Sequence, residues 1–127
     1  MEYYQVSFYS EYYKRDVWFE IDEKNEQKIS NTLEALVGTR NHFTIDDLCI
    51  DLIDNDVSAF LTRAIEHGKV SFYNTSISHI LYGSDSTRLV KKYDLGRILI
   101  KSFKVGQDNK LSTLSVVFNQ GNDILKN

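Results

Sequence analysis

Aspartate is concentrated in one short segment of this sequence, TIDDLCIDLIDND, which contains no lysine or arginine. Clustered carboxylates can act as an acid–base pair, bind a divalent cation or attract a basic macromolecule. An EF-hand calcium loop counted from Asp54 is excluded, because Ala59 stands where glycine is required and Ile65 where the glutamate ligand is required. No acid–base pair can be chosen without a fold. We interpret the segment as a binding site for a basic partner, formed by Asp46, Asp47, Asp51, Asp54 and Asp56. An ordinary solvated face is the alternative.

Aromatic side chains are the second unusual feature, since eight of them lie within the first nineteen residues. If Tyr4, Phe8 and Phe19 face the core, the remaining rings lie on the opposite face of two strands or at the bend between them. Tyrosine and tryptophan are enriched at protein interfaces, because they combine a large apolar area with a hydrogen-bonding tip. The pattern predicts a partner-binding surface made of Tyr3, Tyr9, Tyr12, Tyr13, Trp18 and Glu20. Alternatively, helices cover this face and the rings form a second core.

Signatures of catalysis and of cofactor binding are lacking in the sequence. The three histidines are scattered, and neither an HExxH pattern nor a CxxC pair is present. The six glycines form neither GxGxxG nor a phosphate-binding loop. The single cysteine, Cys49, lies among acidic residues that disfavour a reactive thiolate. We therefore expect no catalytic residue, no metal and no cofactor, and a protein that is not an enzyme.

Charge is distributed unevenly along the chain, although the net charge is only −3. Residues 1–66 hold fourteen acids and six bases, a balance of −8, whereas residues 67–127 hold four acids and nine bases, a balance of +5. The halves can attract each other within one fold, or attract partners of opposite charge. In the basic half, aromatic rings alternate with cations in a manner compatible with binding of single-stranded nucleic acid. These cations are Arg88, Lys91, Lys92, Arg97, Lys101, Lys104 and Lys110.

Hydrophobic periodicity indicates the elements that position these residues in the first part of the chain. Strict alternation predicts strands over residues 3–9 and 17–22, joined as an antiparallel hairpin. From Glu23 the apolar spacing changes to that of a helix, which Gly38 can end. This helix is predicted to bury Ile29, Leu33, Leu36 and Val37.

Two further helices are predicted across the aspartate-rich segment and beyond it. Thr44 with Asp47 three residues later resembles a capping box, so we expect a helix on which Asp47 and Asp51 are one turn apart. Its inward-facing residues are Ile45, Leu48 and Leu52. Asp56 can cap the next helix, which Gly68 follows. That helix is predicted to bury Val57, Phe60, Leu61, Ala64 and Ile65.

The remainder of the chain is predicted to form strands. Their ranges are 69–74, 77–82, 87–93, 97–105 and 111–118, with a hairpin turn near Gly106 between the last two. Strands at both ends of a sequence and helices between them indicate an α+β domain. We expect residues 1–127 to form one such domain, with a mainly antiparallel sheet, an N-terminal hairpin, two to three helices packed on one face, and C-terminal strands.

A non-catalytic protein inhibitor fits this combination of features best. The lone cysteine allows no internal disulfide, and no secretion signal or membrane span is evident, which favours a cytoplasmic protein. We expect a bacterial immunity protein, an antitoxin that neutralises a basic nuclease-type toxin through the acidic and aromatic residues named above. The alternatives are a phage-type inhibitor of a host nucleoprotein and a single-stranded nucleic-acid binding module that uses the basic half.

Overall fold

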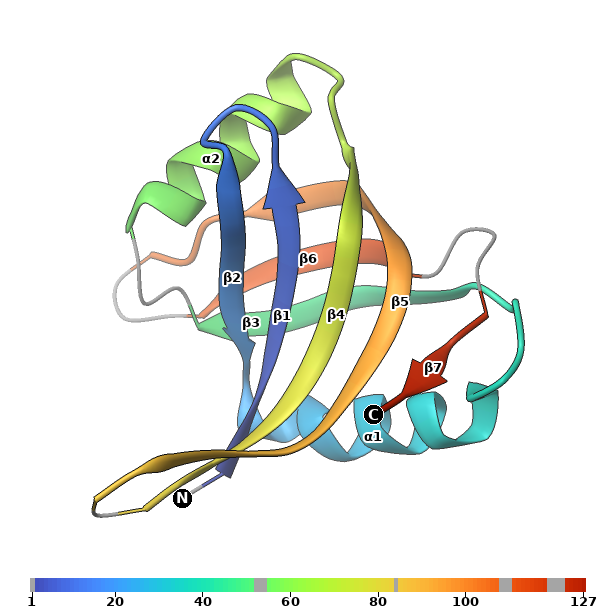
Figure 1. Cartoon of the computed structure of the whole chain (residues 1–127). Helices are drawn as coiled ribbons and strands as arrows, with labels where there is room; N and C mark the ends of the chain where they lie inside the picture. Colours follow the sequence, from blue (N-terminus) through green and yellow to red (C-terminus); the bar gives the residue numbers. More distant parts are fainter. Residues whose placement is uncertain (1, 52–54, 84, 108–110, 119–122) are drawn as a thin grey trace.

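The computed structural model describes residues 2–51, 55–83, 85–107, 111–118 and 123–127. Its main element is an antiparallel sheet in which β5 pairs both with β6 and with β4, so that six strands in the order β4-β1-β2-β3-β6-β5 close into a ring (Figure 1). The fold is α+β, as predicted. The strands are β1 (Glu2–Ser10), β2 (Arg15–Ile21), β3 (Phe43–Asp51), β4 (Ser71–Tyr82), β5 (Thr87–Lys104), β6 (Ser112–Phe118) and the short β7 (Leu125–Lys126).

The N-terminal hairpin is confirmed, with β1 and β2 in register from Tyr4 opposite Ile21 to Ser10 opposite Arg15. The strands that follow the helices are longer than the alternation indicates. The predicted pair 69–74 and 77–82 is one strand, β4, and the pair 87–93 and 97–105 is one strand, β5.

Local irregularities explain why these two strands appear broken in the sequence. The β4–β5 register shifts around Thr75, which lies opposite Gly96. Gly96 and Asn74, the residue before Thr75 that has no register partner on β5, have positive φ angles of 81° and 53°. Such bulges bend a strand and shift its alternation without ending its pairing, which is how an 18-residue strand can curve around a closed sheet.

The helix predicted from Thr44 is wrong, because this segment forms β3. The bulge at Asp46 and Asp47 is the reason: the register against β6 shifts between Ile45 and Leu48, and Asp47 has a φ of 54°. One extra residue moves the buried positions to Ile45, Leu48 and Ile50. A spacing of three residues followed by two imitates the start of a helical stripe. Residues 52–54, including the predicted inward-facing Leu52, lie outside the described residues.

Two helices, α1 (Glu23–Leu36) and α2 (Asn55–Glu66), cover opposite ends of the ring (Figure 1). The Asp22 carboxylate caps α1 by accepting a hydrogen bond from the backbone N–H of Lys24 at 3.3 Å. The predicted glycine ends are confirmed, since Gly38 (φ +82°) and Gly68 (φ +70°) adopt the left-handed conformation after α1 and α2. Both helices pack against the inner face of the sheet, one from each end.

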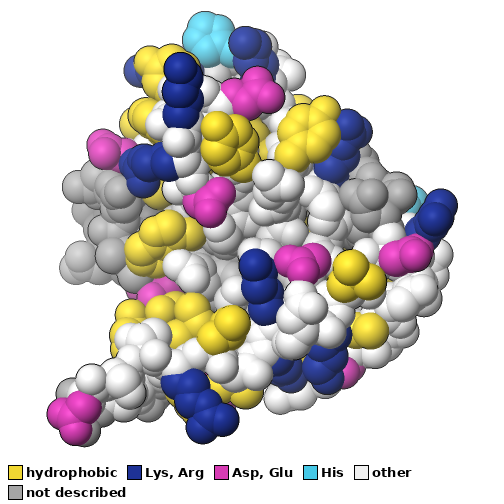
Figure 2. Space-filling view, in the orientation of Figure 1, with side chains coloured by type: hydrophobic (Ala, Val, Ile, Leu, Met, Phe, Trp, Pro, Cys, Tyr) yellow, Lys and Arg dark blue, Asp and Glu magenta, His cyan; other side chains and the backbone are white. Residues whose placement is uncertain are grey.

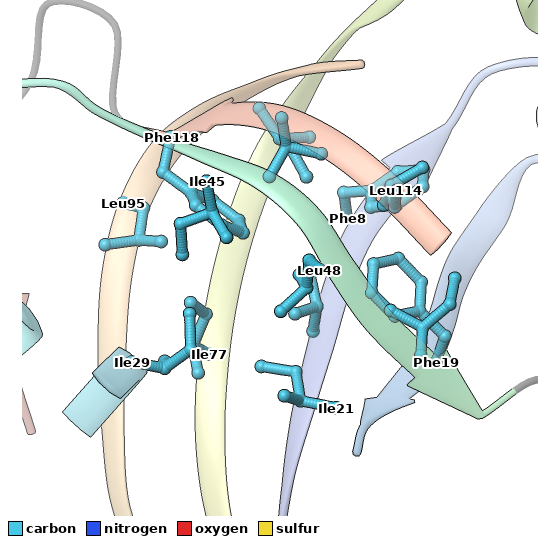
Figure 3. Close-up of a cluster of buried hydrophobic side chains, with 14 of the residues drawn as sticks. Phe8, Phe19, Ile21, Ile29, Ile45, Leu48, Ile77, Leu95, Leu114 and Phe118 are labelled. Atoms are coloured by element: carbon cyan, nitrogen blue, oxygen red, sulfur yellow. The ribbon is translucent and has the colours of Figure 1, made fainter. Parts of the chain in front are cut away.

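A single continuous cluster of apolar side chains fills the ring, and Figure 3 shows side chains from several strands and from α1 pointing into it. Tyr4, Phe8 and Phe19 are buried, as their alternation predicts. Each buried large side chain contributes about 1.5–3 kcal/mol to stability relative to an exposed one. The helices add Ile29, Leu33, Val57, Phe60 and Leu61 to the cluster.

A polar clamp fastens α1 to the sheet. The Glu34 carboxylate accepts hydrogen bonds from the Tyr93 hydroxyl and from the ammonium groups of Lys126 (2.8 Å) and Lys91 (3.3 Å). These donors, led by Lys126 and Tyr93, lower the pKa of Glu34 to about 2. Because Tyr93 is fully buried and belongs to β5, the clamp joins the helix to the core as well as to the C-terminal strand β7.

Candidate binding surfaces

The outer face of β2 and β3 brings together Trp18, Glu20 and Asp51, which we call the acidic surface. Trp18 and Glu20 alternate with the buried residues of β2 and are both partly buried. Glu20 lies directly opposite Asp51 where β2 meets β3, so two carboxylates face each other across the ladder. Like charges in this position destabilise a sheet by a few tenths to about 1 kcal/mol.

The negative charge of the acidic surface has no salt-bridge partner within the described part of the chain. Burial raises the pKa of Glu20 above its ordinary value, and the Asp51 carboxylate raises it further. Neither carboxylate forms a salt bridge with any described lysine, arginine or histidine. The surface therefore holds negative charge on the same face as an indole ring, and neither carboxylate is paired with a cation among the residues that the structure describes.

The other predicted aspartates lie apart from this pair. Asp46 and Asp47 occupy the bulge of β3, where both side chains are exposed and the Asp46 carboxylate lies 3.7 Å from the Lys101 ammonium group. The backbone N–H of Asp47 donates to the Ser115 hydroxyl at 3.2 Å. Asp56 is in the first turn of α2, and Asp54 lies outside the described residues. The sequence predicted one row of carboxylates along a helix. Instead, Asp46, Asp47 and Asp51 lie on strand β3 and Asp56 lies on α2.

The aromatic residues of the predicted surface divide between two ends of the molecule. Tyr3 stacks on Tyr82 with ring centroids 4.8 Å apart, and its hydroxyl donates to the Tyr82 hydroxyl at 3.2 Å. Burial and this hydrogen bond raise the pKa of Tyr3. Tyr9, Tyr12 and Tyr13 lie instead near α2. Trp18 stays beside Glu20 on the outer face of β2, and Tyr3 on β1 lies near enough for the Glu20 charge to contribute to its raised pKa.

A groove of about 950 Å³ opens between the β1–β2 turn, the C-terminal half of α2 and the start of β4. Its apolar part is formed by packed aromatic rings. The centre of the Phe60 ring lies 5.3 Å from the centre of the Phe72 ring and 5.5 Å from that of the Tyr13 ring. Its other lining residues include Tyr9, Tyr12, Arg63, His67, Lys69 and Tyr73. We call it the tyrosine groove. Figure 2 shows apolar side chains at the end of the molecule where α2 lies, interspersed with Lys, Arg and His and with Asp or Glu side chains.

Arginine side chains stack on tyrosine rings around this groove. The Arg63 guanidinium lies 5.7 Å from the centre of the Tyr12 ring and donates to the Tyr12 hydroxyl at 3.2 Å. The Arg97 guanidinium lies 4.5 Å from the centre of the Tyr73 ring and donates to its hydroxyl at 2.8 Å. A third arginine, Arg15, lies 5.3 Å from the Tyr13 ring. Each contact holds a cation in place while most of its N–H donors stay available.

The sequence alone did not reveal the tyrosine groove. Arg63 meets Tyr12 across a separation of 51 residues, and Tyr73 meets both Tyr9 and Arg97 through the β1–β4 and β4–β5 registers. Neither a spacing rule nor a motif connects such residues. The available signals were the doubled tyrosines of the turn and the Arg97 cation, which the sequence placed in separate features.

No reactive centre is evident among the residues that the structure describes. No three histidine, cysteine, aspartate or glutamate side chains there come close enough to hold a metal ion. Cys49 lies on β3, where its backbone N–H donates to the Asn25 side-chain oxygen at 3.0 Å. Within the same ranges, no helix has the length and apolar character that a membrane span requires.

Comparison with known proteins found no relative: no family model matches the chain, and neither a curated protein nor a solved structure shows significant similarity to it.

Proposed function

We propose that this protein is a non-catalytic binding protein that recognises a basic protein through the acidic surface of Trp18, Glu20 and Asp51. The observation that carries this proposal is the pairing of Glu20 with Asp51 directly across the β2–β3 ladder, with no described cation near enough to form a salt bridge. The pair costs stability in the free protein. A cation from a partner would relieve that cost, so the charge complementarity contributes to binding.

Trp18 supplies the apolar anchor that such an interface needs. It lies two residues before Glu20 on the same outer face of β2, and its indole is partly exposed. Interface hot spots combine an aromatic side chain with a neighbouring charge whose hydrogen bonds form away from water. The exposed carboxylate of Asp47 adds negative charge on β3, whereas that of Asp46 is partly compensated by Lys101, and the added charge would accelerate association with a positively charged protein.

The specific role that we propose is immunity to a toxin, with the partner being a basic nuclease-type toxin domain. Nucleases carry positive charge where they bind phosphates, and an acidic surface can occupy that charge without any chemistry of its own.

The experiment that tests this function is a quantitative pull-down from lysate of the source organism, treated with nuclease to remove nucleic acid. Wild-type bait is compared with the charge reversal Glu20→Lys/Asp51→Lys and with a matched control, Glu66→Lys/Asp85→Lys, which changes the net charge equally at exposed positions elsewhere. We expect a basic protein that the wild type and the control retain and the Glu20/Asp51 variant loses.

The captured protein is then purified and its nuclease activity is titrated with the wild-type chain. Stoichiometric inhibition supports immunity. A captured protein that binds both variants equally contradicts a role for the acidic surface. A protein that depends on Glu20 and Asp51 but has no activity to inhibit contradicts immunity while leaving recognition through this surface intact.

A further inference from the structure

We propose that the tyrosine groove is a second binding site, and that its ligand is a segment of single-stranded nucleic acid. Bases would stack on Tyr12 and Tyr73, and phosphates would contact Arg63, Lys69 and Arg97. The site is distinct from the acidic surface, and the inference does not depend on the function proposed above.

The exposed tyrosines provide the stacking platforms. Tyr12 is 70% exposed and Tyr73 51%, whereas Phe60 and Phe72, which also line the groove, are packed in or against the core. An exposed ring held against an arginine is ordered on one side and open on the other. Every nucleic-acid base has a flat π face that can stack on such a ring, whereas an extended acidic peptide has planar groups only at particular side chains.

The positive charge around the groove is arranged for phosphates. Arg63, Arg97 and Lys69 form no salt bridge with any described carboxylate, and the guanidinium groups are held by tyrosine rings instead. Among the charged residues that line the groove, Glu11 is the single acid, against Arg63 and Lys69. An arginine stacked on an aromatic ring keeps donors for a phosphate in a fixed orientation.

The position of the groove, rather than its size alone, favours a strand over a single nucleotide. Its volume of about 950 Å³ lies at the upper end of the roughly 300–1,000 Å³ range of small-ligand pockets. Tyr73 continues the site over the outer face of the sheet, because Tyr9, Tyr73 and Arg97 lie in one row across β1, β4 and β5. The ligand path therefore runs from the β1–β2 turn to the outside of β5.

The test is fluorescence anisotropy of a labelled oligothymidylate of about twelve nucleotides, titrated with the full chain at about 50 mM and about 200 mM salt. If about three phosphates are neutralised, the affinity should fall about twentyfold over this fourfold change in salt. Tyr12→Ala and Tyr73→Ala should each weaken binding by at least about fivefold. Arg63→Gln and Arg97→Gln should each make the salt dependence shallower.

Matched controls lie on the hairpin formed by the ends of β4 and β5, which protrudes at the end of the molecule away from α2 (Figure 1). Tyr82→Ala removes an exposed tyrosine and Arg88→Gln removes an exposed arginine. Both should bind the oligonucleotide as the wild type does. Because all six substituted side chains lie at or near the surface, circular dichroism should show an unchanged fold.

Results of three kinds would overturn the inference. The first is absence of binding at the lower salt concentration, or equal losses in the groove variants and the controls. The second is displacement of the oligonucleotide by polyglutamate at equal charge concentration, which would show that the groove captures any anionic chain. The third is binding of adenosine monophosphate as tightly as the oligonucleotide, which would make the groove a small-molecule pocket. The Glu20→Lys/Asp51→Lys variant should keep the groove intact, so failure of one proposal leaves the other open to test.

Discussion

Glu34 on α1 and Glu20 on β2 both carry a carboxylate beside the closed sheet, yet the charges around the two are opposite. The Glu34 carboxylate meets Tyr93 and two lysines, and its pKa is lowered to about 2. The Glu20 carboxylate meets Asp51, and its pKa is raised. The clamp at α1 has its countercharges within the chain, whereas the acidic surface lacks them among the described residues. The difference shows that Glu34 stabilises the fold through its countercharges, whereas Glu20 costs stability in the free protein.

The largest expected effect is on association with the partner. Reversing both charges of the acidic surface, in Glu20→Lys/Asp51→Lys, should slow association with the captured basic protein at least about tenfold at low salt, because electrostatic steering is lost. Stopped-flow or surface plasmon resonance measurements across a salt series would show this, together with a shallower salt dependence. Association rates equal to those of the Glu66→Lys/Asp85→Lys control would contradict a role for Glu20 and Asp51 in binding the partner.

A loss of thermal stability is expected when the clamp is broken. Glu34→Gln removes the charge that Lys91 and Lys126 share, so its melting temperature should lie below that of the wild type at neutral pH. Since the pKa of Glu34 is lowered in the folded state, the stabilisation is complete above the ordinary value of 4.5 and is lost as the pH falls toward about 2. Thermal melts of both proteins should therefore converge over this acidic interval. A constant difference would mean that the substitution acts through packing.

A small gain in stability is expected when the repulsion between Glu20 and Asp51 is removed. Glu20→Gln removes one of two facing charges and should stabilise the free protein by about half a kcal/mol at neutral pH. Because the pKa of Glu20 is raised in the folded state, the folded protein takes up its proton more readily than the unfolded chain. The difference in free energy of unfolding between the variant and the wild type should therefore shrink as the pH falls through that raised pKa. Urea denaturation at several pH values measures this, and a destabilised variant at neutral pH would contradict it.

The sequence predicted those elements whose signals are local. The hairpin of β1 and β2, both helices of the structure and the strand β6 follow from alternation, apolar stripes and glycine ends. The prediction failed at β3, where the Asp46–Asp47 bulge changes the spacing of the buried residues. It also did not predict closure of the sheet, because the β4–β5 and β3–β6 pairings depend on long-range registers that no short pattern encodes.

The candidate sites were predictable to different degrees for the same reason. Trp18 and Glu20 belong to one strand, so alternation placed them on one face. Asp51 joins them through its register with Glu20, and the sequence had placed it on a helix. The tyrosine groove combines a turn, a helix end and two further strands, so no window of the sequence contains enough of it to be recognised.

Closure of the sheet has a consequence for how the protein opens. A ring has no terminal strand, so its weakest junction decides where opening begins, and among the described residues β2 and β3 meet through only two register pairs, Glu20 with Asp51 and Ile21 with Ile50. By comparison, β1 and β2 share seven. Hydrogen exchange should show the amide of Asp22, which donates to the Cys49 carbonyl across this junction at 2.9 Å, losing protection before those in the centre of β1. The junction that carries the facing carboxylates would then be a latch, and a partner that neutralises them would hold it shut.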